Sequence, residues 1–379
     1  METVIKEVRS KREFADFIGL PAKIHVNQPN WVPPIYLDEK GFFNPKKNSS
    51  FKGCDHIRLM AYRNNVPVGR IMGLIPHKYN QLKNENNARF SYLETYDDQE
   101  VVHALLQQIE KWARNLGAEK MVGPLGFSDK EPQGYLVEGF DEPIPLACYA
   151  NFKYQVDLLQ NEGYSGEVNL VVYKADVPAI VPPVYQKILP RLEQLNSEFR
   201  MVDFKSRLKL RPYIRPVLTL TNRAFRFIYA SVPYEEHEMD AFANRFILFL
   251  NPRLIKVVEN RKKEVIAYLV AMPDITDGLR KCKGHLLPTG IFSVLRSGKK
   301  SDRMIMLLGA IDEPYRGRGL DVLLALKLFE SARREGKKII DSHVVLEDNL
   351  SMRREYDQIG GKVYKRYTIF AKSLGNQSV

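Results

Sequence analysis

Two arginines and two glycines lie where a strand is expected to turn into a helix; they are Arg316, Gly317, Arg318 and Gly319. They follow an apolar run at 304–311 and precede a segment at 320–332 whose apolar residues recur at helical spacing. The first N–H groups of a helix have no partner within it, and the helix dipole favours an anion there. Glycine lets the backbone come close to a ligand, and arginine adds positive charge. The stretch therefore predicts a phosphate or pyrophosphate seat formed by backbone N–H groups from Arg316 through Leu320.

The elements that must position this seat predict a mixed α/β fold. In the second half we expect a strand at 199–204, helices at 216–230 and 235–250, and a hairpin at 254–272. The strand that feeds the seat is expected to begin at residue 302. The segment 273–300 is expected to be an irregular insert. The first half predicts the same order of elements, including a hairpin that turns at Asn64 and Asn65. A proline-rich stretch at 176–183 is the expected boundary, giving domains at 1–177 and 184–374.

The first half lacks a counterpart of the anion seat. The turn before its long predicted helix at 97–116 is acidic rather than rich in arginine and glycine. We therefore expect no second pyrophosphate in this half. The segment Trp31–Tyr36, with two prolines, is expected to be an irregular apolar lip that packs against the sheet or lines a ligand site. The irregular structure is expected to continue through Gly41–Pro45.

Composition narrows the class of protein. The 379 residues contain 44% hydrophobic and 27% charged residues, which is typical of globular domains, and carry a formal charge of +12. That charge favours an anionic partner or a mildly basic surface, while the basic cluster at 207–215 lies outside any nucleic-acid-binding motif. Three separated cysteines indicate neither a disulfide framework nor a metal centre. A charged N-terminus and the absence of an apolar run of ~20 residues predict a cytoplasmic protein without a membrane span.

The junction and the segment after it resemble the GCN5-related N-acetyltransferase (GNAT) superfamily. In that family an Arg or Gln is followed by two residues, Gly, one residue and Gly or Ala. Arg316, Gly319 and their neighbours match this pattern, except that Asp321 stands where the last small residue belongs. The second signature of the family is similar to the series Asn349, Tyr356, Gly360–Tyr364. Asn151 and Tyr154 give a weaker form of the second signature in the first half.

The chain also resembles a group of bacterial acetyltransferase-like proteins of similar length. The shared features are Trp31–Pro34, Val68–Ile71, Gly123–Pro124 and Glu138–Asp141. Relatives in this group are associated with acylation of long-chain amines in bacterial sphingolipid synthesis. The resemblance therefore implies two tandem GNAT-like domains with mostly antiparallel central sheets flanked by helices.

The resemblance implies an N-acyltransferase that takes acetyl-CoA or a longer acyl-CoA as co-substrate. The pyrophosphate would lie at the seat, and the amide arm of the donor would pair with the strand edge formed by Leu308, Gly309, Ala310 and Ile311. Asn349 would contribute to donor binding, and the Tyr356 hydroxyl would protonate the departing thiolate. Asp321 would repel the donor pyrophosphate unless its side chain points away.

The general base and the acceptor stay open in the sequence. Glu313, His343 and Glu347 are the candidate bases, since all lie near expected strand ends, and histidine has a suitable ordinary pKa. The acceptor would be a small-molecule or lipid amine, with peripheral membrane contact as one possibility and no nucleic acid partner. The alternative is a GNAT-fold binding or scaffold protein without catalytic activity.

Overall fold

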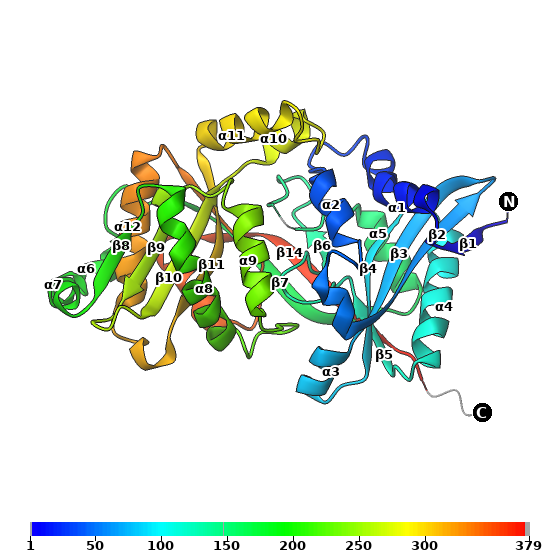
Figure 1. Ribbon diagram of the computed structural model, residues 1–379, viewed down its shortest axis with the longest axis horizontal. Coiled ribbons are helices and arrows are strands. Elements are labelled where there is room, and N and C mark those ends of the chain that lie inside the picture. Colours follow the sequence, from blue (N-terminus) through cyan, green and yellow to red (C-terminus); the bar gives the residue numbers. More distant parts are fainter. Residues whose placement is uncertain (1, 147, 376–379) are drawn as a thin grey trace. The chain divides into compact units, whose positions relative to one another are not determined.

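The structure, a computed structural model, describes residues 2–146 and 148–375, which divide into two compact units (Figure 1). Unit 1 contains the chain up to Val171, the segment Leu279–Pro288 and the residues from Lys365 onward. Unit 2 contains Val172–Gly278 and Thr289–Tyr364. Unit 1 thus takes in two segments that lie far beyond the expected boundary near residue 177.

The sheet of unit 1 is mostly antiparallel, as expected. Its strands, in spatial order, are β1 (Val4–Glu7), β2 (Cys54–Arg63), β3 (Val66–Pro76), β4 (Asn87–Thr95), β5 (Lys120–Gly123) and the later part of β14 (Lys362–Ser373). Only the β4–β5 pair is parallel within this series. The β2–β3 hairpin turns at Asn64 and Asn65, whose φ values of +50° and +63° confirm the predicted tight turn. Strand β6 (Tyr135–Glu138) also pairs with β14, and the first part of β7 (Ser165–Asp176) belongs to this unit.

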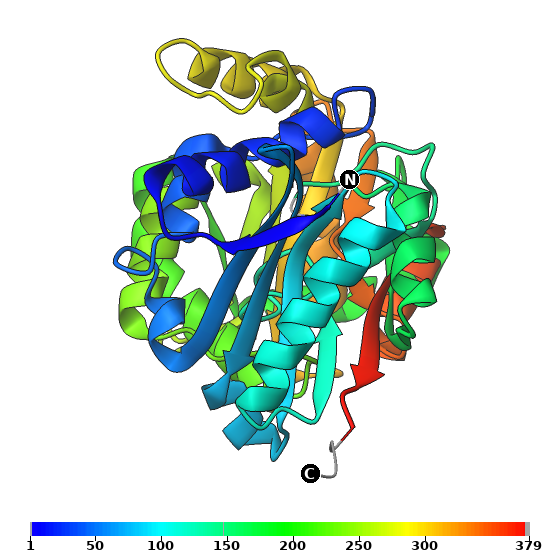
Figure 2. The ribbon, with the colours of Figure 1, turned by 90° about the vertical axis from the view of Figure 1, so that its right-hand side faces the viewer.

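Helices cover both faces of the unit 1 sheet. Helix α4 (Gln99–Asn115) packs on β2, β3 and β4 from one side and lies in front of these strands in Figure 2. Helix α1 (Lys11–Ile24) packs on β3 and β4 and belongs to a separate apolar core with Tyr92. The shorter helices are α2 (Tyr36–Phe42), α3 (His77–Lys83) and α5 (Lys153–Asn161). The expectation of an irregular segment through residue 45 missed α2, which begins directly after the two prolines.

Unit 2 repeats this arrangement. Its strand order is β12 (Ile339–Ser342), β11 (Arg303–Ile311), β10 (Val265–Pro273), β9 (Ile255–Glu259) and β8 (Arg200–Asp203), with only β11 and β12 parallel. The last residues of β7 pair with β12, and β13 (Val345–Leu346) follows it. Helix α8 (Arg207–Ala224) packs on one face through Leu210, Val217 and Leu220. Helix α12 (Leu320–Arg334) packs on the other through Leu320, Leu323 and Leu324.

Two segments, 273–300 and 207–215, contain helices where the sequence predicted none. The remaining helices of unit 2 are α6 (Pro183–Gln186), α7 (Leu189–Glu198), α9 (Glu236–Phe246), α11 (Gly290–Lys300) and α13 (Leu350–Gln358), and α10 (Thr276–Lys281) begins in unit 2 and ends in the unit 1 segment that starts at Leu279. The expected irregular insert at 273–300 holds α10 and α11, whose glycines obscured the helical pattern. Gly298 faces Ile275 so closely that a Cβ would lie 3.1 Å from its Cγ2, so packing overrides weak propensity there. The basic stretch 207–215 is likewise helical and forms the first part of α8.

Candidate active site

Strand β11 diverges from its parallel neighbour, β12, after four pairs of residues. Pairing with β12 runs from Arg303 to Met306, and the His343 N–H donates to the Met306 carbonyl at 2.9 Å where the strands diverge. On the other side β10 stays paired as far as Ile311, with a bulge that leaves Leu307 without an opposite residue. From Met306 to Ile311 every residue is partly exposed. Within the described residues, no strand pairs with the β12-side edge of Leu307–Ile311. This is the edge at which the sequence predicted pairing of Leu308, Gly309, Ala310 and Ile311 with the amide arm of a donor.

The predicted strand–turn–helix junction is present at the end of β11. A short turn of helix, η3 (Glu313–Tyr315), leads to Gly317 and Gly319, whose φ values are +71° and +88°. Both glycines thus adopt the left-handed conformation that other residues avoid. Gly319 is the N-cap of α12, and its position provides no side chain that could cap the first turn. The N–H groups at the start of α12 are therefore not satisfied by a capping side chain.

The two arginines of the junction bond to their own unit. Arg316 Nε donates to the Ile311 carbonyl at 3.2 Å, so its guanidinium folds back over the end of β11. Arg318 forms an ion pair with Glu198 at the end of α7, and its guanidinium lies 4.8 Å from the centre of the Phe199 ring. Both side chains remain exposed and keep positive charge beside the start of α12.

Two acidic residues, Asp321 and Glu355, lie near the start of α12. Asp321 is in the first turn of α12, and Glu355 of α13 is close enough to sense its charge. Burial, with the negative charge of Asp321 adding to it, raises the pKa of Glu355 to about 7. The sequence drew attention to Asp321 but gave no signal for Glu355, because the two carboxylates come from separate helices.

Helix α13 holds Tyr356 in the interior of unit 2. Asn349 caps this helix by accepting from the Met352 N–H at 3.2 Å, so its side-chain oxygen serves the helix start. Tyr356 is 8% exposed, and no hydrogen bond to its hydroxyl is found among the described residues. Burial raises the pKa of Tyr356 above its ordinary value, with the negative charge of Asp341 adding to the effect. The phenol is therefore protonated at neutral pH and able to donate.

Two residues that the sequence did not single out position this tyrosine. The Tyr173 ring stacks on the Tyr356 ring, and Arg353 Nε donates to the Tyr173 hydroxyl at 3.0 Å. Arg353 also donates from Nη1 to the Glu347 carbonyl at 2.8 Å, which ties the loop before α13 to the same group. Gly361 packs on Tyr356 so closely that a Cβ would lie 2.8 Å from its carbonyl oxygen. This contact gives a physical reason for a glycine in the second signature.

The three candidate bases occupy different environments. His343 follows β12 at the point where it diverges from β11, and its side chain is partly buried. Glu347 is partly buried in the loop before α13. Glu313 is 71% exposed and forms an ion pair with Arg226 at 3.4 Å, so it faces solvent. Of the three, His343 lies closest along the chain to the strand divergence.

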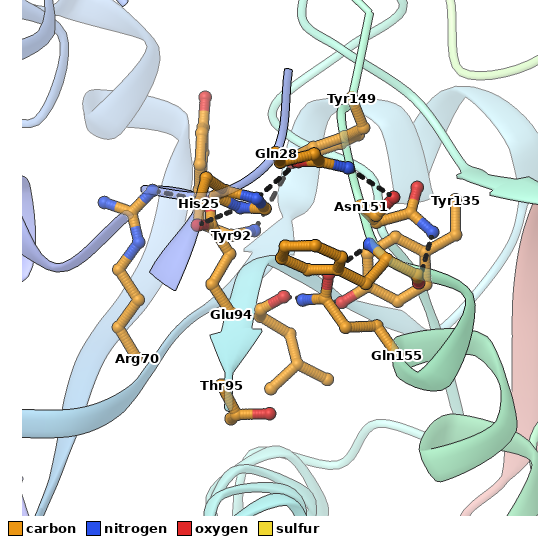
Figure 3. Close-up of polar contacts among 12 residues, drawn as sticks. His25, Gln28, Arg70, Tyr92, Glu94, Thr95, Tyr135, Tyr149, Asn151 and Gln155 are labelled. Atoms are coloured by element: carbon orange, nitrogen blue, oxygen red, sulfur yellow. Dashed lines mark hydrogen bonds and ion pairs between the residues drawn. The ribbon is translucent and has the colours of Figure 1, made fainter. Parts of the chain in front are cut away.

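In unit 1 the equivalent strand edge is covered by tyrosines, two of which, Tyr135 and Tyr149, are labelled in Figure 3. The Tyr135 hydroxyl donates to the Leu93 carbonyl at 2.5 Å, and Tyr154 donates to the Thr95 carbonyl at 2.9 Å. The Tyr92 N–H donates to the Tyr149 hydroxyl at 3.3 Å, at a β-bulge where Tyr92 has a φ of +54°. Strand β4 is buried almost throughout, whereas β11 is partly exposed over its last six residues.

A buried charged group lies beside these tyrosines, and the sequence gave no sign of it. Glu94 lies 2.9 Å from Arg70 and 3.2 Å from Nε2 of His25, whose Nδ1 is 2.7 Å from Gln28 (Figure 3). Burial alone would raise the pKa of Glu94, but the Arg70 charge and hydrogen bonds from His25 and Arg70 lower it to about 2. The His25 ring stacks on Trp31, which places the expected apolar lip against this group.

The start of α4 also differs from the start of α12. Asp98 caps α4 by accepting from the Val101 N–H at 3.2 Å, and its carboxylate forms an ion pair with Arg63. A carboxylate thus occupies the helix start at which an anion would bind. The acidic turn predicted from the sequence therefore has a structural role in unit 1.

Comparisons with known proteins give two full-length relatives and a solved structure of the same architecture. No protein-family model matches the chain. The chain is 28% identical to the bacterial ceramide synthase of Caulobacter vibrioides, over 97% of this chain and 96% of that protein. It is 24% identical to protein YghO of Escherichia coli, over 98% of this chain and 95% of that protein.

The solved structure is a tandem GNAT protein from the clavulanic acid biosynthesis pathway. It superimposes with a TM-score of 0.58 at 13% identity, and the match covers 100% of both chains. Together with the repeated β-sheet units, each of which contains one parallel strand pair, this match identifies the architecture. The chain has the tandem GNAT fold.

Proposed function

We propose that this protein is an N-acyltransferase that moves an acyl group from acyl-CoA to the primary amine of a long-chain lipid. The donor would bind in unit 2. The observation that carries the proposal is the contrast between the equivalent strands β11 and β4. The edge of β11 at Leu307–Ile311 is unpaired and partly exposed, whereas tyrosine side chains cover the edge of β4.

The residues of unit 2 fit such a donor. Backbone groups of Leu308, Gly309, Ala310 and Ile311 would pair with the amide arm, as in an added strand. The pyrophosphate would lie against the N–H groups from Arg316 to Leu320, where no side chain from the N-cap position competes. The exposed guanidinium groups of Arg316 and Arg318 would add attraction. Asn349 would act through the start of α13, which its side chain caps.

The proposed chemistry assigns a role to each candidate. The neutral amine attacks the thioester carbonyl carbon, the C–N bond forms and the C–S bond breaks. The Tyr356 hydroxyl gives its proton to the departing sulfur, which leaves as the thiol. His343 is the proposed base for the amine proton, since its backbone marks the strand divergence. Glu347 is the second choice, and the exposed, ion-paired Glu313 is the weakest.

The lipid nature of the acceptor rests on the relatives. A bacterial ceramide synthase aligns with this chain over nearly the full length of both proteins, and ceramide synthesis acylates a long-chain amine. The basic net charge of +12 is compatible with an acceptor that resides in an anionic membrane. We therefore propose a sphingoid-like amine rather than a soluble one. The proposed setting is the cytoplasm.

The test combines donor binding with turnover. Wild-type protein should be stabilised thermally by coenzyme A, by about 2.7 kcal/mol at a hundred times its dissociation constant. Wild type should also release thiol when given acyl-CoA and long-chain amines. Tyr356→Phe should keep the stabilisation and lose most of the thiol release. Stabilisation without turnover over a range of amines would instead favour the alternative, a GNAT-fold binding protein, for which the acidic pair Asp321 and Glu355 near the seat is the specific argument.

A further inference from the structure

Helix α11 presents a phenylalanine to solvent on the same face as three basic residues. Its buried side consists of Gly290, Val294 and Gly298, which recur every four residues. The opposite, exposed side carries Phe292, Arg296, Lys299 and Lys300. Phe292 is 69% exposed. The helix is labelled in Figure 1 and contains no acidic residue.

This face has no partner within the described part of the chain. No ring contact covers Phe292, and no ion pair is formed by Arg296, Lys299 or Lys300. Another exposed phenylalanine provides a contrast, because Phe227 is 79% exposed but has the Arg226 guanidinium 4.5 Å from its ring centre. Arg226 in turn pairs with Glu313.

The chain just before α11 also exposes apolar side chains. Leu287 lies five residues before Phe292 and is 73% exposed, and Pro288 next to it is exposed as well. Exposed aromatic and aliphatic side chains bordered by lysine and arginine are typical of helices that lie in the plane of a membrane surface. No helix among the described residues has the length and apolar character needed to cross a bilayer.

We propose that α11 docks this protein on an anionic phospholipid surface, with Phe292 inserted among the acyl chains and Arg296, Lys299 and Lys300 at the headgroups. Charge complementarity selects this occupant: the basic residues match anionic headgroups, and the apolar ring on the same face needs an apolar phase. The inference deepens the proposed function, because a long-chain amine would be taken from such a surface.

Vesicle sedimentation tests the docking without any need for turnover. The intact protein is mixed with vesicles of phosphatidylcholine alone or of phosphatidylcholine with an equal part of phosphatidylglycerol. Wild type should bind the anionic vesicles and not the neutral ones. Phe292→Ser should weaken that binding roughly tenfold through lost apolar burial. Lys299→Ala and Lys300→Ala should each weaken it about fivefold, an effect that high salt suppresses.

Phe227→Ser is the matched control, since it removes an equally exposed ring outside α11 and should leave binding unchanged. Circular dichroism should be the same for all variants, because each changes an exposed side chain. The proposal would be overturned if Phe292→Ser bound anionic vesicles as tightly as wild type does. It would also be overturned if wild type bound neutral vesicles as tightly as anionic ones. Preferential binding to a nucleic acid of matched charge would overturn it too.

The two proposals can fail separately. If wild type binds anionic vesicles through Phe292 but never transfers an acyl group, the proposed function fails and the docking stands. If Phe292→Ser acylates amines dispersed in detergent and amines in vesicles equally well, and also binds vesicles normally, the docking fails and the function stands.

Discussion

The aromatic ring of Tyr356 lies flat against that of Tyr173, with centroids 4.9 Å apart and planes 12° apart. Tyr173 is itself held at its hydroxyl by Arg353, which is three residues before Tyr356 on α13. The proposed acid is therefore positioned by a neighbouring strand rather than by its own helix alone. This arrangement separates the tyrosine that would act from the tyrosine that orients it.

Replacing Tyr173 should reduce turnover without reducing donor binding. Tyr173→Leu removes the stacked ring, and a stacked pair contributes ~1 kcal/mol beyond its burial, so Tyr356 would lose its fixed orientation. We expect kcat to fall about tenfold because misplacement slows the proton transfer step. The dissociation constant of coenzyme A, measured by calorimetry, should stay the same.

Tyr173→Phe is the conservative control for this prediction. It keeps the stacking and removes only the oxygen that accepts from Arg353, so kcat should recover most of its value. A purely structural role for Tyr173 would instead lower the melting temperature of both variants and leave kcat of the folded fraction unchanged.

Gly317→Ala should weaken donor binding through the conformation of the junction. A Cβ at Gly317 meets nothing within 4 Å, so the only obstacle is the φ of +71°, which costs alanine about 1 kcal/mol. Gly336→Ala at the other end of α12 is matched, because Gly336 has a φ of +70° and the same open surroundings. Denaturant unfolding should show similar losses for both variants, while calorimetry should show weaker coenzyme A binding for Gly317→Ala only. Equal donor affinity in the two variants would exclude the junction as the seat.

Donor affinity should fall as pH rises through 7. Below that pH the Glu355 carboxyl, whose pKa burial and Asp321 raise to about 7, is protonated and neutral. Above it a second negative charge joins Asp321 near the start of α12 and repels a phosphorylated donor, by a few tenths to ~1 kcal/mol per charge. Calorimetry with coenzyme A at pH 6 and pH 8 measures the effect.

Two variants isolate the groups responsible for that pH dependence. Glu355→Gln should bind several-fold more tightly than wild type at pH 8 and lose the part of the pH dependence due to protein titration. Asp321→Asn should also bind more tightly at pH 8. Glu330→Gln is the control, because Glu330 is 39% exposed and lies farther along α12 than Asp321. This variant should keep the wild-type dependence of donor affinity on pH. An unchanged slope in Glu355→Gln would show that another group titrates.

Glu94→Gln should strongly destabilise the protein. The carboxylate is 13% exposed and lies 2.9 Å from Arg70, which is 3% exposed, so removing its charge leaves a buried guanidinium poorly compensated. Loss of one partner of such a pair costs roughly 3 kcal/mol or more. Glu167→Gln is the surface control, since the pair of Glu167 with Lys120 is about one-third exposed and should contribute less than ~1 kcal/mol. Urea unfolding of the two variants compares them.

The sequence predicted most of the fold because local patterns determine most of its elements. Alternating apolar residues and the Asn64–Asn65 turn indicated the β2–β3 hairpin, and the glycines of the junction indicated the start of α12. Helices α10 and α11 were missed because glycine is used there for close packing, which a propensity pattern does not reveal. Helix α2 was missed for a related reason, since two prolines precede it.

The candidate site was predictable only where its residues are neighbours in the chain. The seat lies within one short stretch, and Tyr356 follows Asn349 at a fixed spacing. Tyr173, Glu355 and the His25–Glu94–Arg70 group depend on contacts between distant segments, so spacing gave no indication of them. The roles of the predicted residues in catalysis stay predictions.

The pairing of β14 in unit 1 has a consequence for biosynthesis. Residues Phe370–Ser373 pair with Gly123–Lys120 of β5, so a strand made early finds its neighbour among the last residues described. While the ribosome is still translating unit 2, β5 has an open hydrogen-bonding edge of the kind that promotes aggregation. A gene fragment that stops after β7 would therefore encode an incomplete sheet, and the nascent first half must wait until β14 has been translated to close it.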